Sequence, residues 1–297
     1  MRHAILGPGG VGGMMGACLA RIGEAVTMVG RAETLPASPS KLELESPFGN
    51  VSVDVTWAGS VPPTDVLWLT VKATQLESAL RSIRDPGSVG AIVPLLNGLD
   101  HIELLRSKFG ADHVIPATIG GEMERVSAGH FVHRSPFAIL NILATGCALL
   151  QSVCERLRGI GFICNFMDDE TTLMWSKLVF LAPIALTTSA FDKTVGEVAA
   201  DPKAWAQFEA CVRETAAAGR AEGASLDPET VLKLVKGAPF GMRSSMQKDV
   251  SAGLPPELDA IGGAILRAAA QHGLDAATTK NLMAQIEHRR GAAREIA

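Results

Sequence analysis

Short apolar runs alternate with helical patterns in the first half of the chain. The runs are rich in Val, Ile and Leu and are bounded by Gly, Pro or polar residues, which is typical of strands that are buried on both faces. The clearest runs are residues 3–6, 25–29, 66–71 and 89–95, and helical stretches follow at 14–22 and 100–108. Strands that alternate with helices predict a parallel sheet. We therefore expect an N-terminal α/β domain with a Rossmann-type, doubly wound sheet.

Shorter elements fill the rest of this half. Apolar and polar residues alternate over 42–45 and 51–55 on either side of a Pro-Phe-Gly-Asn turn, which predicts a hairpin. A helix is expected over 72–84. Further strands are expected near residues 114–118, 130–133 and 138–143.

From Asp168 onward the pattern changes to one helix after another. The expected helices are residues 171–188, 202–222, 228–236, 257–272 and 276–289, with Gly and Pro clustered between several of them. A chain of 297 residues with 47% hydrophobic residues is long for a single core. We therefore expect an α/β domain over 1–166 and an all-α domain over 167–297, with the functional site between them.

The first strand runs directly into a G-x-G-x-x-G motif that opens a helix. The motif consists of Gly7, Pro8, Gly9, Gly10, Val11 and Gly12. In this context the first glycine permits a tight turn, the second lets the backbone approach a pyrophosphate, and the third allows close packing of helix on strand. The free N–H groups at the helix N-terminus then bind the anion. The motif predicts a dinucleotide-binding site.

The end of the second strand indicates which dinucleotide is bound. NAD-specific domains usually have Asp or Glu there to bind the ribose 2′-hydroxyl, whereas an arginine suits a 2′-phosphate. Here the strand ends in Gly30-Arg31, and Glu33 comes two residues later. A solvated loop charge is the alternative interpretation of Arg31. We predict NADP(H) as the cofactor.

Composition excludes several classes of partner. A net charge of -4 and the absence of a basic stripe argue against nucleic acid or an anionic membrane. Apolar stretches are interrupted by charge or glycine before transmembrane length, so we expect no membrane partner. The chain starts with a strand rather than a signal peptide, which predicts a cytoplasmic protein.

Cysteine, histidine and tyrosine content narrows the chemistry. The five cysteines lack a C-x-x-C spacing and are expected to be buried apolar residues in a reducing compartment. The seven histidines show no paired spacing, so we predict no metal site. The chain contains no tyrosine, so any proton donor must be another residue type.

Lys177 is the strongest candidate for a catalytic residue, because it is the one charged residue in a long apolar helical stretch. Burial lowers the pKa of a lysine and allows it to donate a proton near neutral pH. A lysine whose stem merely covers apolar surface is the alternative. Pro183, one to two turns later, is expected to kink the helix.

Four further residues are individually weak candidates. Glu257 has the position of a helix-capping acid, Ser245 lies in a possible N-cap sequence, and Lys72 follows a strand as a solvated turn residue would. Asn97 lies at the end of another strand. Since the carboxyl ends of parallel strands gather around a ligand, we expect the glycine motif, Arg31, Lys72 and Asn97 to share one crevice.

Together these features resemble the ketopantoate reductase family over nearly the whole chain. The matching motifs are Gly7-Pro-Gly-Gly-Val-Gly12, Arg31, Val71-Lys-Ala-Thr-Gln75, Asn97-Gly98, Trp175-Ser-Lys177, Gly196-Glu197, Ser245-Met246 with Asp249, and Glu257-Leu-Asp259. The resemblance implies NADPH-dependent reduction of 2-dehydropantoate to pantoate, a step of pantothenate biosynthesis. It also implies that Lys177 is the general acid and that Glu257 orients Lys177 and the ligands. Ser245 and Asn97 would then contact substrate, and Asn97 and Lys72 would line the cofactor crevice.

The chain departs from the family pattern at three polar positions. Family asparagines that would follow the lysine by one and two helical turns are Leu181 and Ala185, and a third is Val195. A hydroxyl buried without a partner costs on the order of 1–3 kcal/mol, so a pocket with Leu181 and Ala185 at the substrate favours a 2-oxo acid with an apolar tail.

These departures leave other functions open. A D-2-hydroxy acid dehydrogenase or an imine-forming reductase of the same family is one alternative. A non-catalytic NADP-binding regulator is another, although the presence of Lys177 counts against it. The small-molecule partner is expected to be a 2-oxo acid, and the long C-terminal helices are compatible with a homodimer.

Overall fold

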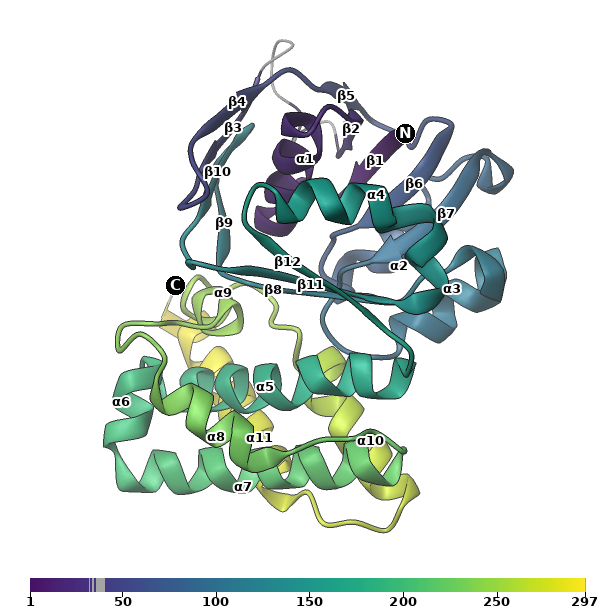
Figure 1. Cartoon of the computed structure of the whole chain (residues 1–297). Helices are drawn as coiled ribbons and strands as arrows, with labels where there is room; N and C mark the ends of the chain where they lie inside the picture. Colours follow the sequence, from purple (N-terminus) through teal and green to yellow (C-terminus); the bar gives the residue numbers. More distant parts are fainter. Residues whose placement is uncertain (32, 34, 36–40, 297) are drawn as a thin grey trace. The chain divides into compact units, whose positions relative to one another are not determined.

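The computed structural model describes residues 1–31, 33, 35 and 41–296, which divide into two compact units (Figure 1). Unit 1 comprises Met1–Leu96 and His101–Leu173, and unit 2 comprises Asn97–Asp100 and Met174–Ala297. A short segment, 97–100, thus belongs to unit 2 although the residues on both sides of it belong to unit 1. The assignment of cofactor and substrate roles to 1–166 and 167–297 remains a prediction.

Unit 1 is built on a five-stranded parallel sheet with the order β5-β2-β1-β6-β7, which confirms the Rossmann-type domain. Its strands are β1 (Arg2–Leu6), β2 (Ala25–Val29), β5 (Thr56–Ala58), β6 (Thr64–Leu69) and β7 (Val89–Pro94). Alternate side chains pack on opposite faces: Ile5 and Trp68 lie in one apolar cluster, whereas Leu6 and Leu67 lie in another. The continuous apolar runs of the sequence therefore form strands buried on both faces.

Helices cover both faces of this sheet. The side chains of α1 (Gly10–Arg21) contribute to the cluster around Ile5, and those of α2 (Leu76–Leu80) and α3 (His101–Phe109) to the cluster around Leu6. The prediction of a helix over 72–84 was too long. A 3-10 turn, Ala73–Gln75, precedes α2, which ends at Leu80.

Two small sheets complete unit 1, with the orders β4-β3-β10-β9 and β12-β11-β8. The predicted hairpin is confirmed as β3 (Leu42–Glu45) and β4 (Val51–Val53), which pair antiparallel. The other bounds are β8 (Ala117–Gly120), β9 (Met123–Ser127), β10 (His130–His133), β11 (Ala138–Leu143), β12 (Phe162–Met167) and α4 (Cys147–Arg158). Sequence reasoning missed β9, α4 and β12. Polar residues occupy much of β9, and Asn165 interrupts the apolar residues of β12, so neither forms a continuous apolar run.

The described part of unit 2 is helical, as predicted. Its helices are α5 (Glu170–Phe191), α6 (Val195–Ala200), α7 (Pro202–Ala221), α8 (Pro228–Lys236), α9 (Ser245–Ser251), α10 (Ala264–Gln271) and α11 (Ala277–Ile296). Helix α5 begins in unit 1, and a π-helical turn, Asp259–Gly263, leads into α10. Side-chain caps define the starts of α6, α7 and α9: Thr194, Asp201 and Ser244 accept hydrogen bonds from backbone N–H groups of the first turn.

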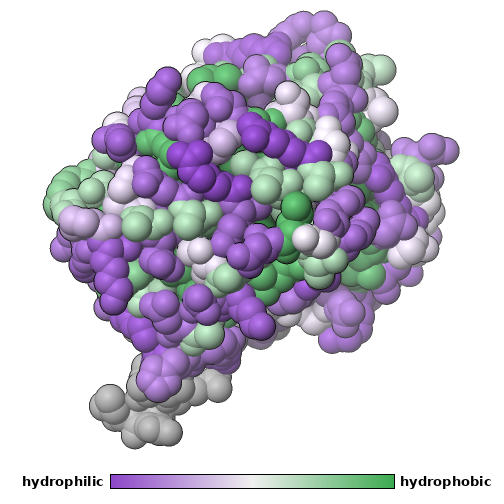
Figure 2. Space-filling model, turned by 90° about the horizontal axis from the view of Figure 1, so that it is seen from below, coloured by the Kyte–Doolittle hydropathy of each residue, from purple (hydrophilic) through white to green (hydrophobic). Residues whose placement is uncertain are grey.

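Helix α5 is the centre of the helical core. It continues through Pro183 to Phe191. Contrary to expectation, it is long and apolar enough to cross a membrane by length and composition, yet 78% of its most apolar window is buried. Leu178, Ala182 and Leu186 pack in one apolar cluster with residues of α10 and α11, which identifies α5 as a core helix. Polar residues cover much of the face seen in Figure 2, and apolar residues form scattered patches between them.

Burial of the cysteines, as their apolar character predicts, is confirmed for four of the five and is wrong for Cys147. Cys18, Cys154, Cys164 and Cys211 are buried and Cys147 is partly exposed, all as free thiols. Burial raises the pKa of Cys18 and of Cys211 to about 12, so these thiols stay protonated and unreactive.

Candidate functional site

The glycine turn after β1 is held tightly against the neighbouring strand ends. Gly7 has φ +106°, a conformation that favours glycine, and its N–H donates to the Val29 carbonyl at 3.1 Å. The hydroxyl of Thr70, just beyond β6, donates to the Gly7 carbonyl at 2.8 Å. A Cβ at Gly12 would overlap the Gly7 carbonyl oxygen and the Thr70 hydroxyl. Close packing therefore requires glycine here, and Thr70 is a contributor that sequence reasoning missed.

The N-terminus of α1 has the properties of an anion site. Gly9 is the N-cap, and neither a capping side chain nor an acidic residue occupies the first turn. A Cβ added at Gly9 would have no heavy atom within 4 Å, whereas one at Gly10 would overlap the Met123 carbonyl. Open space beside Gly9 and the positive end of a 12-residue helix fit a pyrophosphate, as the motif predicts.

Two basic residues follow other strands of the same sheet. Arg31 comes after β2 and Lys72 comes after β6. Because both strands run parallel to β1, these residues lie beyond the carboxyl ends of the strands, at the same end of the sheet as the glycine turn. The Arg31 side chain is 72% exposed and lies 3.5 Å from a carboxylate oxygen of Glu33. The acid that could be read as an NAD-type residue is therefore an ion-pair partner of Arg31. Asn97, which was expected in the same crevice, belongs to unit 2.

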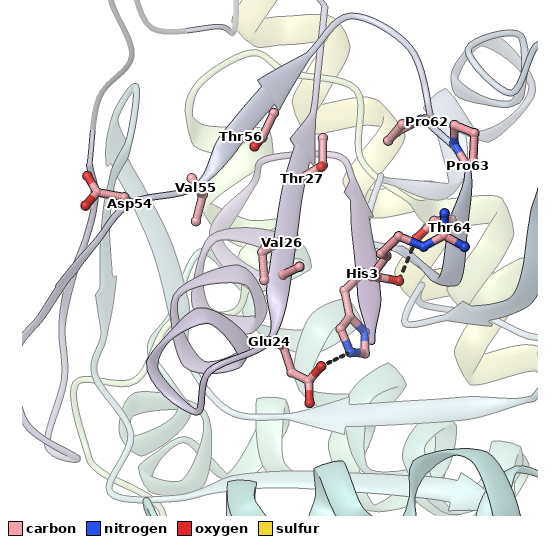
Figure 3. Close-up of a pocket in the computed structure, with 12 residues that line it drawn as sticks. His3, Glu24, Val26, Thr27, Asp54, Val55, Thr56, Pro62, Pro63 and Thr64 are labelled. Carbon is pink, nitrogen blue, oxygen red and sulfur yellow. Dashed lines mark hydrogen bonds and ion pairs between the residues drawn. The ribbon is translucent and has the colours of Figure 1, made fainter.

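A separate hollow of about 470 Å³ lies at the opposite end of the sheet (Figure 3). It is lined by Arg2, His3, Glu24, Ala25, Val26, Thr27, Asp54, Val55, Thr56, Pro62, Pro63 and Thr64. Nε2 of the buried His3 lies 3.3 Å from Glu24, and its Nδ1 accepts a hydrogen bond of 3.1 Å from Trp68. Burial lowers the pKa of His3 and favours the neutral ring. The hollow contains none of the predicted site residues, and the Glu24 carboxylate is paired with the N-terminal ammonium group and with Arg156.

The structure brings three predicted residues together in unit 2. Lys177 projects from α5, where Trp175 and Leu178 are buried beside it in the chain. Burial lowers the pKa of Lys177 to about 8, and the negative charge of Glu257 opposes this shift. Glu257 is itself buried and accepts a hydrogen bond of 3.0 Å from the Asn97 side-chain amide. The cluster thus joins a cation, an anion and an amide.

The residues that replace the family's asparagines lie in two different places. Leu181 is half-buried and packs against the apolar cluster that contains the fully buried Ala185. Both follow Lys177 on α5 at a spacing that places them on its face. Val195 instead packs into a second cluster formed with α7 and α8. Leu181 can therefore offer apolar surface beside Lys177, whereas Ala185 is enclosed in the apolar cluster on the same face of the helix.

Adjacent serines at the start of α9 differ in their contacts. Ser244 is buried, caps α9 by accepting from the Gln247 N–H at 3.0 Å, and shares a hydrogen bond of 2.7 Å with Thr188 of α5. Ser245, the residue predicted to contact substrate, is exposed. Ser244 and Thr188 thus fix α9 on α5, while Ser245 lies on the accessible side.

This arrangement is suited to proton transfer. With a pKa of about 8, Lys177 is mostly protonated at neutral pH but gives up its proton more easily than an exposed lysine. The Glu257 carboxylate stabilises the ammonium form, and Asn97 restricts where that carboxylate lies.

Two family models match the chain. One described as "Ketopantoate reductase PanE/ApbA" matches residues 3–142, and one described as "Ketopantoate reductase PanE/ApbA C terminal" matches residues 169–290. A 2-dehydropantoate 2-reductase of Mycobacterium tuberculosis is 31% identical, with 91% of this chain and 92% of that protein covered.

Solved structures share the fold over nearly the full length. A PanE/ApbA family ketopantoate reductase from Ralstonia eutropha has 22% identity and a TM-score of 0.87, with 99% of this chain and 100% of that chain covered. A D-mandelate dehydrogenase solved with NADH and anilino(oxo)acetate has 21% identity and a TM-score of 0.86, with 98% and 99% covered.

The pKa of Lys177 can be measured by chemical labelling. Acetic anhydride acetylates neutral amines, so labelling at a series of pH values, followed by mass spectrometry, reports the pKa of this side chain. We expect a pKa of about 8 in the wild-type protein. Glu257→Gln removes the charge that favours the ammonium form and should lower the pKa of Lys177 further.

Glu229→Gln provides the control, because Glu229 is an exposed carboxylate of unit 2 that pairs with Arg213. It should leave the Lys177 titration unchanged. A Lys177 pKa at the ordinary lysine value, or one insensitive to Glu257→Gln, would contradict the electrostatic description of the cluster.

Proposed function

Because the chain belongs to the ketopantoate reductase family of oxidoreductases, we propose that it reduces the keto group of a 2-oxo acid with NADPH. The cluster of Lys177, Glu257 and Asn97 carries the proposal, since it provides a proton donor of suitable pKa beside a fixed carboxylate. Reduction of a ketone to an alcohol needs a hydride at carbon and a proton at oxygen. The protein supplies the proton.

Residues at the carboxyl ends of the parallel strands of unit 1 would hold the cofactor. The turn from Gly7 to Gly12 and the N-terminus of α1 suit the pyrophosphate, and Arg31 suits the 2′-phosphate. Lys72 and Asn97 are proposed as further cofactor contacts, with Glu257 next to Asn97. When bound, the nicotinamide supplies the hydride. A mandelate dehydrogenase of this fold was solved with NADH, so the choice of NADPH here depends on Arg31.

Lys177 acts as the general acid. Its ammonium group donates a proton to the oxygen of the keto group as that oxygen gains negative charge, and it regains a proton from solvent afterwards. Glu257 keeps Lys177 charged before the transfer and, through the Asn97 amide, stays in one position. Ser245, on the accessible side of α9, is proposed to contact the substrate.

The substrate is proposed to have an apolar side chain. Leu181 and Ala185 offer no hydrogen bond to the hydroxyl group of 2-dehydropantoate, whose burial without a partner would cost about 1–3 kcal/mol. A role in pantothenate biosynthesis therefore requires contacts from other residues. The same apolar surface favours, as second candidate, a D-2-hydroxy acid dehydrogenase that works in the direction of oxidation. Cytoplasmic location and a homodimer remain predictions from the sequence.

A substrate panel tests the proposal. NADPH oxidation is followed with 2-dehydropantoate, 2-oxoisovalerate and bulkier unhydroxylated 2-oxo acids, and NADP+ reduction with the matching D-2-hydroxy acids. We expect the highest kcat/KM for an unhydroxylated acid. Preference for 2-dehydropantoate would contradict the substrate assignment, and NADPH binding without turnover of any acid would indicate a regulator instead.

Leu181→Asn sharpens this test. An amide one turn after Lys177 gives a substrate hydroxyl a partner, so we expect kcat/KM for 2-dehydropantoate relative to 2-oxoisovalerate to rise by about tenfold, within the ~1–3 kcal/mol of an unpaired group. Leu234→Asn on α8, at a side chain 60% exposed, is the matched control and should leave the ratio unchanged.

The pH dependence of the rate tests the role of Lys177. Reduction needs the ammonium form, so kcat should be constant below a pH of about 8 and fall about tenfold per pH unit above it. Oxidation of the alcohol needs the neutral amine and should rise towards a plateau above that pH. Lys177→Ala should lower kcat by about 10²–10⁴-fold. Undiminished turnover in this variant would exclude Lys177 as the acid.

Arg31→Ala tests the cofactor assignment. Loss of the guanidinium removes a partner for the 2′-phosphate, which NADH lacks, so the Kd of NADPH should rise about tenfold or more while that of NADH changes little. Isothermal titration of both cofactors measures this. Equal losses for NADPH and NADH would refute the role given to Arg31.

A further inference from the structure

A short turn of unit 2 is packed against the start of the helix that follows Glu257. Asn97 bonds to Glu257 through its side chain, and Gly98 comes next with φ +86°. A Cβ at Gly98 would overlap the backbone carbonyl of Ala260. The turn therefore approaches the backbone of residues 257–260 as closely as glycine permits, and its position fixes that of the Asn97 amide.

Arg267 of α10 links the far end of the same turn to this helix. Its Nη1 donates to a side-chain oxygen of Asp259 at 2.7 Å, and its Nη2 donates to the Asp259 carbonyl at 3.2 Å and to the Asp100 carboxylate. One guanidinium thus bridges the helical turn after Glu257 and the residue that ends the segment 97–100. We refer to Arg267, Asp100 and Asp259 as the arginine bridge.

The helix is shaped to accommodate this bridge. Residues Asp259–Gly263 form a π-helical turn, a feature found frequently at functional sites. A Cβ at Gly263 would overlap the Asp259 carboxylate and would lie 3.0 Å from Nη1 of Arg267. Glycine at 263 therefore leaves the space in which Asp259 and Arg267 meet.

The solvent exposure of the bridge argues against a major role in stability. The side chains of Arg267, Asp100 and Asp259 are 48%, 61% and 84% exposed. Exposed ion pairs contribute little to the free energy of unfolding, because water competes for both partners. Their geometric effect is different, since the bridge holds the turn 97–100 against the helix that directly follows Glu257.

We propose that Arg267 is a positioning residue, which holds the segment 97–100 on the Asp259–Gly263 turn so that Asn97 keeps the Glu257 carboxylate beside Lys177. The inference rests on the proposed function for its effect on turnover. Its effect on Lys177 itself can be measured without any substrate.

Arg267→Ala tests the proposal with four readouts. We expect the urea unfolding midpoint to change little, and the pKa of Lys177, measured by acetylation, to fall, because Glu257 is no longer held in place. The decline of kcat at high pH should move to lower pH by the same amount, and kcat/KM for the best 2-oxo acid should fall about tenfold. Arg267→Lys supplies one cation that cannot bridge both carboxylates and should recover only part of the loss.

Arg213→Ala is the matched control, because Arg213 forms an exposed ion pair with Glu229 in the same unit. It should leave all four readouts unchanged. In a Glu257→Gln background, Arg267→Ala should produce no further shift in the titration of Lys177, since both changes act through the same carboxylate.

An unchanged Lys177 titration in Arg267→Ala, or an equal further shift in the Glu257→Gln background, would overturn the proposal. If the wild-type protein turns over no 2-oxo acid, the proposed function fails, whereas the acetylation experiment still supports or overturns the positioning role of Arg267.

Discussion

The candidate site depends on the burial of one ammonium group in an apolar helix. Removing a lysine from water disfavours its charged form, and an opposite charge restores part of the loss. In α5 these two effects leave Lys177 with a pKa of about 8, where it remains mostly protonated at neutral pH. Glu257 supplies the opposing charge, and its buried carboxylate is stabilised by the Asn97 amide at 3.0 Å. Two backbone features position Asn97 and Glu257. They are the turn that carries Asn97 and the π-helical turn that follows Glu257.

The parallel sheet of unit 1 is subject to a different constraint. The backbone of the glycine turn must pack closely against the end of the neighbouring strand. Gly7, Gly12 and Thr70 pack so tightly that added side-chain atoms would collide, while the space at Gly9 stays open. This combination leaves the first turn of α1 without a side-chain cap and without an acidic residue, as an anion requires. Arg31 and Lys72 then add positive charge beyond the carboxyl ends of the same parallel strands. In the proposed function, unit 1 would recognise the charges of the cofactor and unit 2 would supply the proton.

Sequence patterns predicted features that local chemistry determines. Buried strands, the glycine turn and the isolated lysine of α5 all depend on residues adjacent in the chain. Strand β9 was missed because its polar residues leave no apolar run, and β12 was missed because its burial depends on pairing with β11, which helix α4 separates from it in the sequence. The expectation that charge or glycine interrupts every apolar stretch before transmembrane length was wrong for α5, whose burial in the helical core depends on tertiary packing. The arginine bridge could not be predicted, since Asp100 and Arg267 meet only after the segment 97–100 joins unit 2. Ser244 and Thr188 likewise gain their roles only through tertiary contact.

In the proposed function, Lys177 delivers the proton to the keto oxygen of the substrate. A crystal structure of the protein with NADP+ and oxamate, an unreactive isostere of a 2-oxo acid, tests it most directly. The account predicts that Lys177 Nζ lies within about 3.2 Å of the oxamate amide carbonyl oxygen, which corresponds to the keto oxygen of a substrate. It also predicts that Glu257 remains bonded to Asn97 in that complex. A structure in which Lys177 contacts only the oxamate carboxylate, or in which another side chain or water donates to that oxygen, would contradict the account.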